Sequence, residues 1–170
     1  MRWLYILSVY THILMATFWI GGMLFLSFVL LPAIRKPQYL HLYHRLVHET
    51  GVNFSRLGWW ALSLFFITGL YQLHVRGIEW YDLFKLETYR GPTGRLVALK
   101  LTFYTAILIL QAFHDFLIGP KATRLGEEAP DSKEYRKYKA YARAVGMTVF
   151  FLSLFMALFG VMIVRGGFRV

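Results

Sequence analysis

Apolar residues gather into four long runs along the chain, separated by shorter polar segments. The runs cover residues 3–34, about 57–75, about 96–118 and about 142–164. Each run is close to or above the roughly 20 residues that a helix needs to cross the hydrocarbon core of a bilayer. The pattern predicts an all-α integral membrane protein, in which four transmembrane helices form an up-down bundle within one domain over residues 1–170.

Basic residues, glycines and prolines mark the ends of these runs, as is typical of helix termini. The four runs are followed by Arg35-Lys36, Arg76-Gly77, Gly119-Pro120 and Arg165-Gly166-Gly167 in turn. The amphipathic stretch 38–48 predicts a helix on the membrane surface in the first loop. Asp131 and Glu134 fit a capping box, so we expect one long helix from about Ser132 through the fourth run.

The composition favours a membrane protein over a soluble domain. Hydrophobic residues make up 57% of the chain and charged residues 16%, against about 45–50% and about 25% in soluble domains. Cysteine is absent, which excludes disulfides, thiolate-held iron–sulfur clusters, thiolate zinc sites and covalently attached c-type haem. The net charge of +10 could indicate a nucleic-acid partner. Because Lys and Arg lie mostly in the loops, membrane topology explains them instead.

The distribution of basic residues predicts the orientation of the chain. Eleven Lys and Arg residues lie in the first and third loops, and seven lie on the other side. The positive-inside rule then places the first and third loops in the cytoplasm. Both termini are expected on the outer, periplasmic side of the inner membrane. The oligomeric state is a separate question. A homodimer is expected, because a small four-helix bundle has limited area in which to bury a cofactor.

Histidines form two groups, one toward each face of the membrane. The chain has six of them: His12, His41, His44, His48, His74 and His114. His12 and His74 lie toward the outer face, and the other four lie toward the inner face. A b-type haem needs two axial imidazoles on facing helices and an apolar slot, so this layout suits two haems stacked across the membrane.

The resulting hypothesis is a di-haem b-type cytochrome that transfers electrons across the membrane, with quinol or quinone as its partner. The expected iron ligands are His12 and His74 for the outer haem, and His114 and His44 for the inner haem. His44 is favoured because it is central, although the spacing does not decide between it, His41 and His48. Trp19 and Gly22 share the helical face of His12, so they are expected to line the haem slot.

A polar stripe runs along the third apolar run. Its members, which recur at helical spacing, are Lys100, Tyr104, Gln111, His114 and Asp115. Such a stripe should point into the bundle or into a wet cavity. Lys100, Tyr104 and Gln111 are therefore candidate catalytic residues of an oxidoreductase, for proton handling or for contacts to haem propionates and quinone.

Short motifs resemble those of the copper-resistance D (CopD) domain membrane proteins. His-Ile-Leu at 12–14, Phe-Trp-Ile-Gly-Gly at 18–22 and Leu-Pro at 31–32 are similar to the opening of that family. Residues 54–59 with Thr-Gly at 68–69 resemble its second span, and Lys-Leu at 100–101, His-Asp-Phe at 114–116 and Gly-Pro at 119–120 resemble its third. The resemblance covers nearly the whole chain, and the family name implies copper transport.

HemJ-type protoporphyrinogen oxidases are similar in a more limited way. They also have a histidine in the first span and a Lys-Leu followed by a histidine in the third. HemJ-type proteins bind haem b. This resemblance implies that His12 and His114 are ligands and that Lys100 is a functional residue.

Copper is the alternative to haem. Cu(I) favours thioether and imidazole ligands, and His12 and Met15 lie one turn apart. Further methionines lie in the spans, at Met23, Met147, Met156 and Met162. Methionine is also an ordinary filler of apolar cores. The sequence therefore leaves three functions open: a haem cytochrome, a copper transport or resistance protein, and a HemJ-like oxidase.

Overall fold

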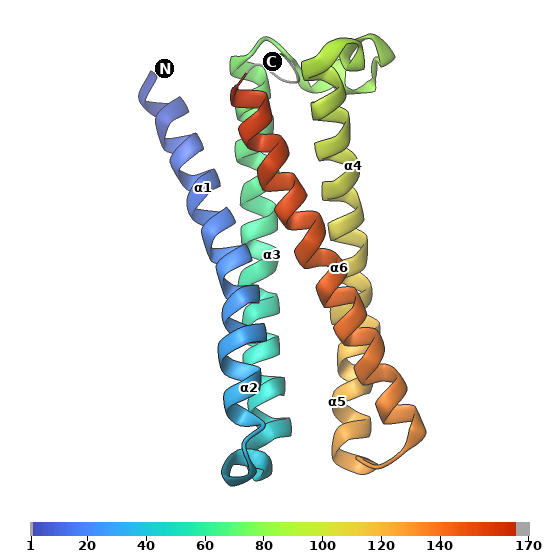
Figure 1. Cartoon of the computed structure of the whole chain (residues 1–170). Helices are drawn as coiled ribbons and strands as arrows, with labels where there is room; N and C mark the ends of the chain where they lie inside the picture. Colours follow the sequence, from blue (N-terminus) through green and yellow to red (C-terminus); the bar gives the residue numbers. More distant parts are fainter. Residues whose placement is uncertain (1, 166–170) are drawn as a thin grey trace.

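The computed structural model describes residues 2–165, and the regular structure in that range is helical throughout. It forms four long rods: Arg2–Ile34, α3 (Tyr43–Val75), Gly91–Glu128 and α6 (Lys133–Val164). Successive rods run in opposite directions, so the beginning of α1 and the end of α6 lie at the same end of the bundle (Figure 1). We call this the termini end, and we call the end that carries residues 35–42 the opposite end.

Two of the rods consist of three segments each. The first rod is α1 (Arg2–Leu24), the π-helical η1 (Phe25–Leu30) and α2 (Leu31–Ile34), and the third is α4 (Gly91–Phe113), the π-helical η5 (His114–Ile118) and α5 (Gly119–Glu128). Pro32 and Pro120 each follow a π-helical segment closely. Proline lacks an N–H and clashes with the carbonyl four residues earlier, and a wider π turn relieves that clash. The helix therefore continues through Gly119-Pro120, and the prediction that this pair ends it is wrong.

Three of the rods are long and apolar enough to cross a membrane: Arg2–Ile34, Gly91–Glu128 and α6. The expectation of apolar membrane helices is confirmed for these three. The remaining rod, α3, is 33 residues long. Its apolar stretch also contains Trp, Tyr, Gln and His, which lower its mean hydropathy. A fourth crossing by α3 therefore stays a prediction.

The first two loops are short and contain 3₁₀ turns. In the first loop, η2 (Pro37–Leu42) leads directly into α3. The stretch 38–48, expected to be a separate surface helix, is divided between η2 and the first turns of α3. The second loop contains η3 (Trp80–Phe84) and η4 (Leu86–Tyr89).

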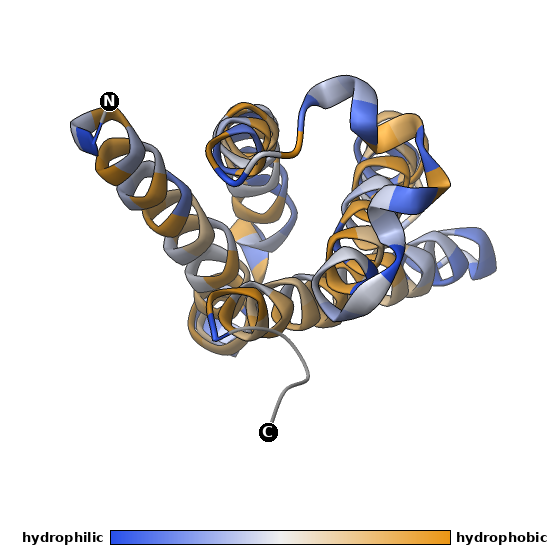
Figure 2. Cartoon of the chain, turned by 90° about the horizontal axis from the view of Figure 1, so that it is seen from above, coloured by the Kyte–Doolittle hydropathy of each residue, from blue (hydrophilic) through white to orange (hydrophobic). Residues whose placement is uncertain are grey.

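The rods pack as two pairs, α1 along α3 and α4 along α6, and contacts between α1 and α6 join the pairs. Figure 2 shows the bundle along its axis, with α6 lying across one side of it. The buried core takes one residue from each rod: Trp19, Leu62, Ile107 and Val149. Gly58 makes room for Trp19, since a Cβ at residue 58 would lie 2.5 Å from Trp19 Cζ3. Trp19 Nε1 also donates to Ser153 Oγ at 3.0 Å, which ties α1 to α6.

Candidate functional site

His12 lies on the face of α1 that packs against α3. Its ring is half-buried and meets the edge of Phe65, with ring centroids 4.9 Å apart. A Cβ at Gly69 would lie 3.9 Å from His12 Cε1, so the absence of a side chain there leaves that side of the imidazole open. The nearby Ser8 donates its hydroxyl to the Thr68 carbonyl at 3.3 Å. Ser8, Thr68 and Gly69 thus form a small polar contact region around His12, between two helices that are otherwise apolar.

Thr68 fixes which nitrogen of His12 carries the hydrogen. The Thr68 hydroxyl donates to the Leu64 carbonyl at 2.6 Å, and His12 Nδ1 lies 2.7 Å from the same hydroxyl oxygen. A hydroxyl has a single hydrogen to donate, so Thr68 Oγ1 accepts from His12 Nδ1–H. A neutral imidazole held in this way presents the lone pair of its Nε2 as a metal ligand.

Lys100 lies at the same level of the bundle as His12. Gly160 of α6 leaves room for its ammonium, since a Cβ there would lie 3.7 Å from Lys100 Nζ. His12 precedes Trp19 by seven residues, and Gly160 follows Ser153 by seven. The Trp19–Ser153 hydrogen bond joins two antiparallel helices. His12 and Gly160 therefore both lie about 10 Å from that hydrogen bond, toward the termini end. Within residues 2–165, Lys100 makes no ion pair.

A second polar cluster surrounds Asp115 in η5. Ser55 and Trp59 of α3 and Gln111 of α4 all donate to Asp115 Oδ2, Trp59 Nε1 at 3.0 Å and Gln111 Nε2 at 2.8 Å. The carboxylate side chain is only 8% exposed. These donors satisfy the charged form of a carboxylate in an apolar setting, where an unpaired charge would be costly. The cluster joins α3 to the third rod near the opposite end of the bundle.

His114 completes this cluster and repeats the arrangement seen at His12. Its Nδ1 lies 2.9 Å from Asp115 Oδ1 and, because that carboxylate oxygen can only accept, Nδ1 is the donor. The imidazole is therefore held with Nε2 outside the hydrogen bond. A carboxylate that orients a histidine in this way is the usual outer partner of a metal-ligating imidazole. His12 and His114 thus present two separate, oriented Nε2 atoms, one toward each end of the bundle.

The structure does not bring together the histidine pairs expected to hold haem. His74 lies six residues beyond Thr68 on α3, which is about 9 Å further along the axis and about 120° away around the helix. Its side chain is 60% exposed and bonds Glu79 at 3.0 Å. His44 lies eleven residues before Ser55, about 16 Å from the level of the Asp115 cluster. The ligand pairs His12 with His74 and His114 with His44 therefore stay predictions, and His41 and His48 are exposed.

The other predicted site residues have protein partners. Trp19 is 2% exposed in the core, and Gly22 lies against the ring of Phe54, where a side chain would collide with it. Tyr104 donates to the Leu62 carbonyl at 2.9 Å, and Gln111 holds Asp115. The polar stripe of the third rod thus points toward α3 at these positions. In this structure Trp19 and Gly22 serve helix packing, while Gln111 positions the His114 site.

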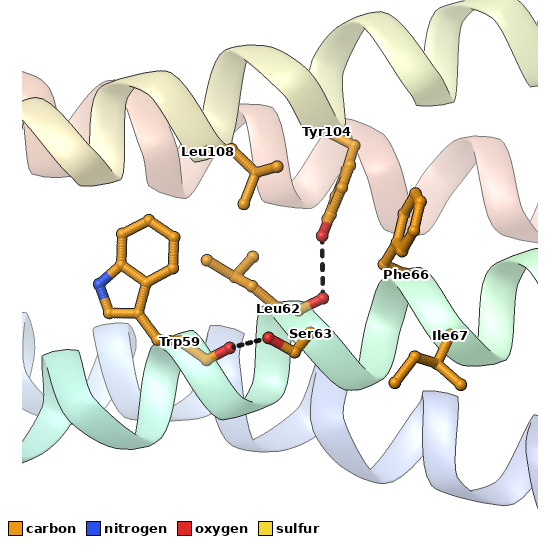
Figure 3. Close-up of a pocket in the computed structure, with 7 residues that line it drawn as sticks. All are labelled: Trp59, Leu62, Ser63, Phe66, Ile67, Tyr104 and Leu108. Atoms are coloured by element: carbon orange, nitrogen blue, oxygen red, sulfur yellow. Dashed lines mark hydrogen bonds between the residues drawn. The ribbon is translucent and has the colours of Figure 1, made fainter.

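A recess of about 380 Å³ lies between α3 and α4. Figure 3 shows its lining, which is mainly apolar: Trp59, Leu62, Ser63, Phe66, Ile67, Tyr104 and Leu108. The hydroxyls of Ser63 and Tyr104 both donate to backbone carbonyls, so they are already paired. Neither hydroxyl is therefore free to donate to a quinone carbonyl, and quinone as a partner stays a prediction.

Within the described residues, no three His, Cys, Asp or Glu side chains come together as a ready metal site. The apolar helices define an all-helical membrane protein, in which His12 and His114 each have Nδ1 held by an acceptor. The family described as copper resistance protein D matches residues 49–162, and the chain belongs to this family.

One relative extends the similarity over nearly the whole chain. A protein of Aquifex aeolicus (strain VF5), described as "Uncharacterized protein", is 31% identical over 164 residues, which cover 94% of this chain and 95% of that protein. No solved structure matches the chain. The resemblance to CopD-domain proteins expected from the sequence motifs is therefore confirmed.

Proposed function

We propose that this protein binds copper ions within the membrane and passes them between two sites, one at His12 and one at His114. The observation that carries the proposal is the matched geometry of the two imidazoles. Each has Nδ1 held by an acceptor, Thr68 or Asp115, and each leaves Nε2 outside that hydrogen bond. Imidazole suits copper, and membership of the copper resistance protein D family supports the choice of metal.

The surroundings of the two sites differ in charge. Lys100 adds a positive charge at the level of His12, which weakens the binding of a cation there. Asp115 lies directly beside His114 and adds a negative charge, which strengthens it. Met15, one turn from His12, can add a thioether, which is a soft ligand for Cu(I). The charge difference favours movement of a copper ion from the His12 site toward the His114 site.

This proposal includes a membrane arrangement of four crossings. We infer that α3 spans the bilayer beside α1, because Thr68 and Gly58 hold the two helices together along their lengths. The larger number of Lys and Arg residues at the opposite end supports a cytoplasmic position for that end. Copper would then move inward, from the periplasmic side to the cytoplasmic side of the inner membrane.

Copper titration of the purified protein in detergent tests the proposal. Wild-type protein should bind two Cu(I) ions per chain against a competing chelator, and His12→Ala and His114→Ala should each bind one. His41→Ala is the matched control, because His41 is exposed and outside both sites, and it should bind two. Unchanged binding in the double variant His12→Ala, His114→Ala would show that the copper sites lie elsewhere.

Haem b is the second candidate ligand, because the same Nε2 atoms could each serve as a single axial ligand to haem iron. An absorption spectrum of the dithionite-reduced protein, produced with ample haem, distinguishes the two. Sharp reduced bands that are lost in His12→Ala or His114→Ala would favour a b-type cytochrome. A featureless spectrum combined with copper binding would leave the copper proposal standing.

A further inference from the structure

A basic pocket lies at the opposite end of the bundle, away from both histidine sites. It is a cavity of about 420 Å³ between the first loop, the start of α3 and the start of α6. Its polar lining comes from Arg35, Tyr43, His44, Tyr135 and Lys139. No Asp or Glu lines it. A cavity lined by cationic and aromatic groups without a carboxylate favours an anion.

No ion pair among residues 2–165 compensates the positive charge of this pocket. Some basic residues at this end of the bundle are paired, as Arg45 is with Glu49 at 2.8 Å and Lys121 is with Glu134 at 3.0 Å. Arg35 and Lys139, in contrast, make no ion pair with any residue in the range 2–165. Two uncompensated cations that share one cavity produce a local positive potential, which attracts an anionic group.

The walls of the pocket are held in place by contacts from three elements. Lys139 Nζ lies 5.1 Å from the ring centre of Tyr43 and 5.4 Å from that of Tyr135, which keeps the ammonium at the cavity wall. Gly126 of α5 lies against the rings of two lining residues, since a Cβ there would lie 2.9 Å from His44 Nδ1 and 3.0 Å from Tyr135 Cε2. A site built in this way needs little reorganisation to bind its ligand.

The position of the pocket indicates where its anion comes from. Arg35 directly follows Ile34, the last residue of an apolar rod, so the pocket lies where a membrane helix emerges at the headgroup level. Leu40 also lines the pocket and is 55% exposed, which provides an apolar surface next to the two cations. A phosphate that is attached to acyl chains matches this combination of cationic and apolar groups.

We propose that this pocket binds the phosphate group of an anionic phospholipid at the cytoplasmic face of the membrane. Arg35 and Lys139 provide the charge, and the rings of Tyr43 and Tyr135 hold Lys139 in place. Free inorganic phosphate offers the same charged group without the acyl chains. The bound lipid would fix the first loop to the start of α6, and so would hold together the end of the bundle near His114.

Native mass spectrometry of protein extracted from vesicles of phosphatidylcholine with phosphatidylglycerol tests this. The wild-type chain should retain phosphatidylglycerol, and Arg35→Gln, Lys139→Gln should reduce the retained fraction on the order of tenfold. The matched control is Lys133→Gln, Lys137→Gln, which removes the same charge from the same end but outside the pocket, and it should retain lipid as the wild type does. Equal loss in both double variants would overturn the site, since it would show binding to surface charge alone.

Two further measurements distinguish the remaining outcomes. Arg35→Lys, Lys139→Arg keeps both charges and should restore retention, which separates loss of the site from a failure to fold. Inorganic phosphate, titrated into the lipid-bound protein, should displace phosphatidylglycerol only weakly. If phosphate displaces the lipid at similar concentration, the ligand is free phosphate and the assignment to a phospholipid is wrong.

Discussion

At the scale of single residues, Thr68 and Asp115 determine what the buried histidines can do. Neither needs to touch a metal. Thr68 Oγ1 accepts from His12 Nδ1 and Asp115 Oδ1 accepts from His114 Nδ1, so each histidine is held as the tautomer that leaves Nε2 for a ligand. Mutation of such outer partners typically lowers metal affinity by about 10- to 100-fold. The two acceptors are therefore the most informative positions for substitution.

Thr68→Val removes the acceptor of His12 and keeps the shape of the side chain. His12 can then turn or change tautomer, so copper affinity at the His12 site should fall roughly 10- to 100-fold. The His114 site should be unaffected. Chelator-competition titration of single-site proteins, which carry His114→Ala or His12→Ala, measures each affinity separately. Thr148→Val is the control, since Thr148 is exposed on α6 and donates to Ala144 O at 3.0 Å. An equal loss of copper affinity in Thr68→Val and Thr148→Val would contradict the proposed role of Thr68.

Asp115→Asn should destabilise the bundle. Ser55, Trp59 and Gln111 all donate to Oδ2, and hydrogen bonds to a charged acceptor contribute about 1.5–3 kcal/mol each. We expect a loss of about 2–4 kcal/mol, because the amide still accepts some of these bonds. Chemical unfolding in mixed micelles measures this loss. Glu49→Gln, at the exposed partner of Arg45, should change little. An equally small change in Asp115→Asn would show that the cluster is not stabilising.

The sequence identified the buried polar residues better than it identified their partners. His12, His114 and Asp115 stand out because charged and polar groups are rare in apolar runs. Ser55 and Trp59 were missed as members of the site, since both residue types are common at membrane interfaces. Their spacing of four residues does place them on one face of α3, which is a usable signal. The pairing of His12 with His74 was inferred from depth alone, and depth does not determine the direction in which a side chain points.

At the scale of elements, the contact between α1 and α3 depends on Gly58. The ring of Trp19 covers it and cannot easily shift, because it stacks on Phe54 with centroids 5.7 Å apart and is held by Ser153. Gly58→Ala should therefore cost about 1–3 kcal/mol of stability, as overpacking of a close-packed core does. Thermal unfolding in detergent measures the effect. Gly21→Ala is the control, because nothing lies within 4 Å of a Cβ there; a loss of stability in Gly21→Ala alone would contradict this assignment.

The second loop is held by a charged pair outside the membrane-spanning segments. The hydrogen bond from the Lys85 ammonium to Asp82 Oδ1, at 2.8 Å, and the backbone N–H of Glu79 lower the pKa of Asp82 from its usual value. The unfolded pKa is about 3.9. Since the folded pKa is the lower one, the stabilisation is fully present above about pH 4 and is lost as pH falls through the folded pKa.

Lys85→Gln should raise the pKa of Asp82 toward its unfolded value, because the hydrogen bond from the Lys85 ammonium is removed. The carboxyl ¹³C chemical shift of Asp82, followed against pH in a nanodisc sample, measures that pKa directly. Arg90→Gln removes the same charge from the same loop without touching Asp82, and it should leave the titration unchanged. An equal shift in both variants would mean that general loop charge, rather than the Lys85 contact, determines the pKa.

Helix ends were predicted with mixed success, for identifiable reasons. The expected long helix near Ser132 is confirmed: Ser132 Oγ accepts from Tyr135 N at 3.0 Å and α6 continues to Val164. The N-cap is Ser132 rather than Asp131, a difference of one residue that composition does not resolve. Gly119-Pro120 was expected to end the third helix. A π turn accommodates that proline instead, and nothing local in the sequence distinguishes the two results.

At the scale of the whole molecule, the two histidine sites transport copper only if they lie at different depths in a bilayer. Three rods are apolar enough to cross it, and the contribution of α3 decides the arrangement. If α3 crosses, residues 38 and 87 lie on opposite sides of the membrane. If it lies along the surface instead, they lie on the same side, and the His12–Thr68 contact would be at the membrane surface rather than within it.

The absence of cysteine from the chain makes this a direct measurement. Single cysteines at Gln38→Cys, Glu87→Cys and Glu127→Cys can be labelled in intact cells with a membrane-impermeant maleimide. We expect residue 87 to react from outside, and residues 38 and 127 to react only after permeabilisation, because the positive-inside rule predicts that the basic loops lie in the cytoplasm. Labelling of 38 and 87 from the same side would remove the fourth crossing. In the reverse pattern, residues 38 and 127 would be labelled from outside, and the four crossings would be kept. The charge difference between the levels of Lys100 and Asp115 would then favour copper movement in the opposite direction, out of the cell.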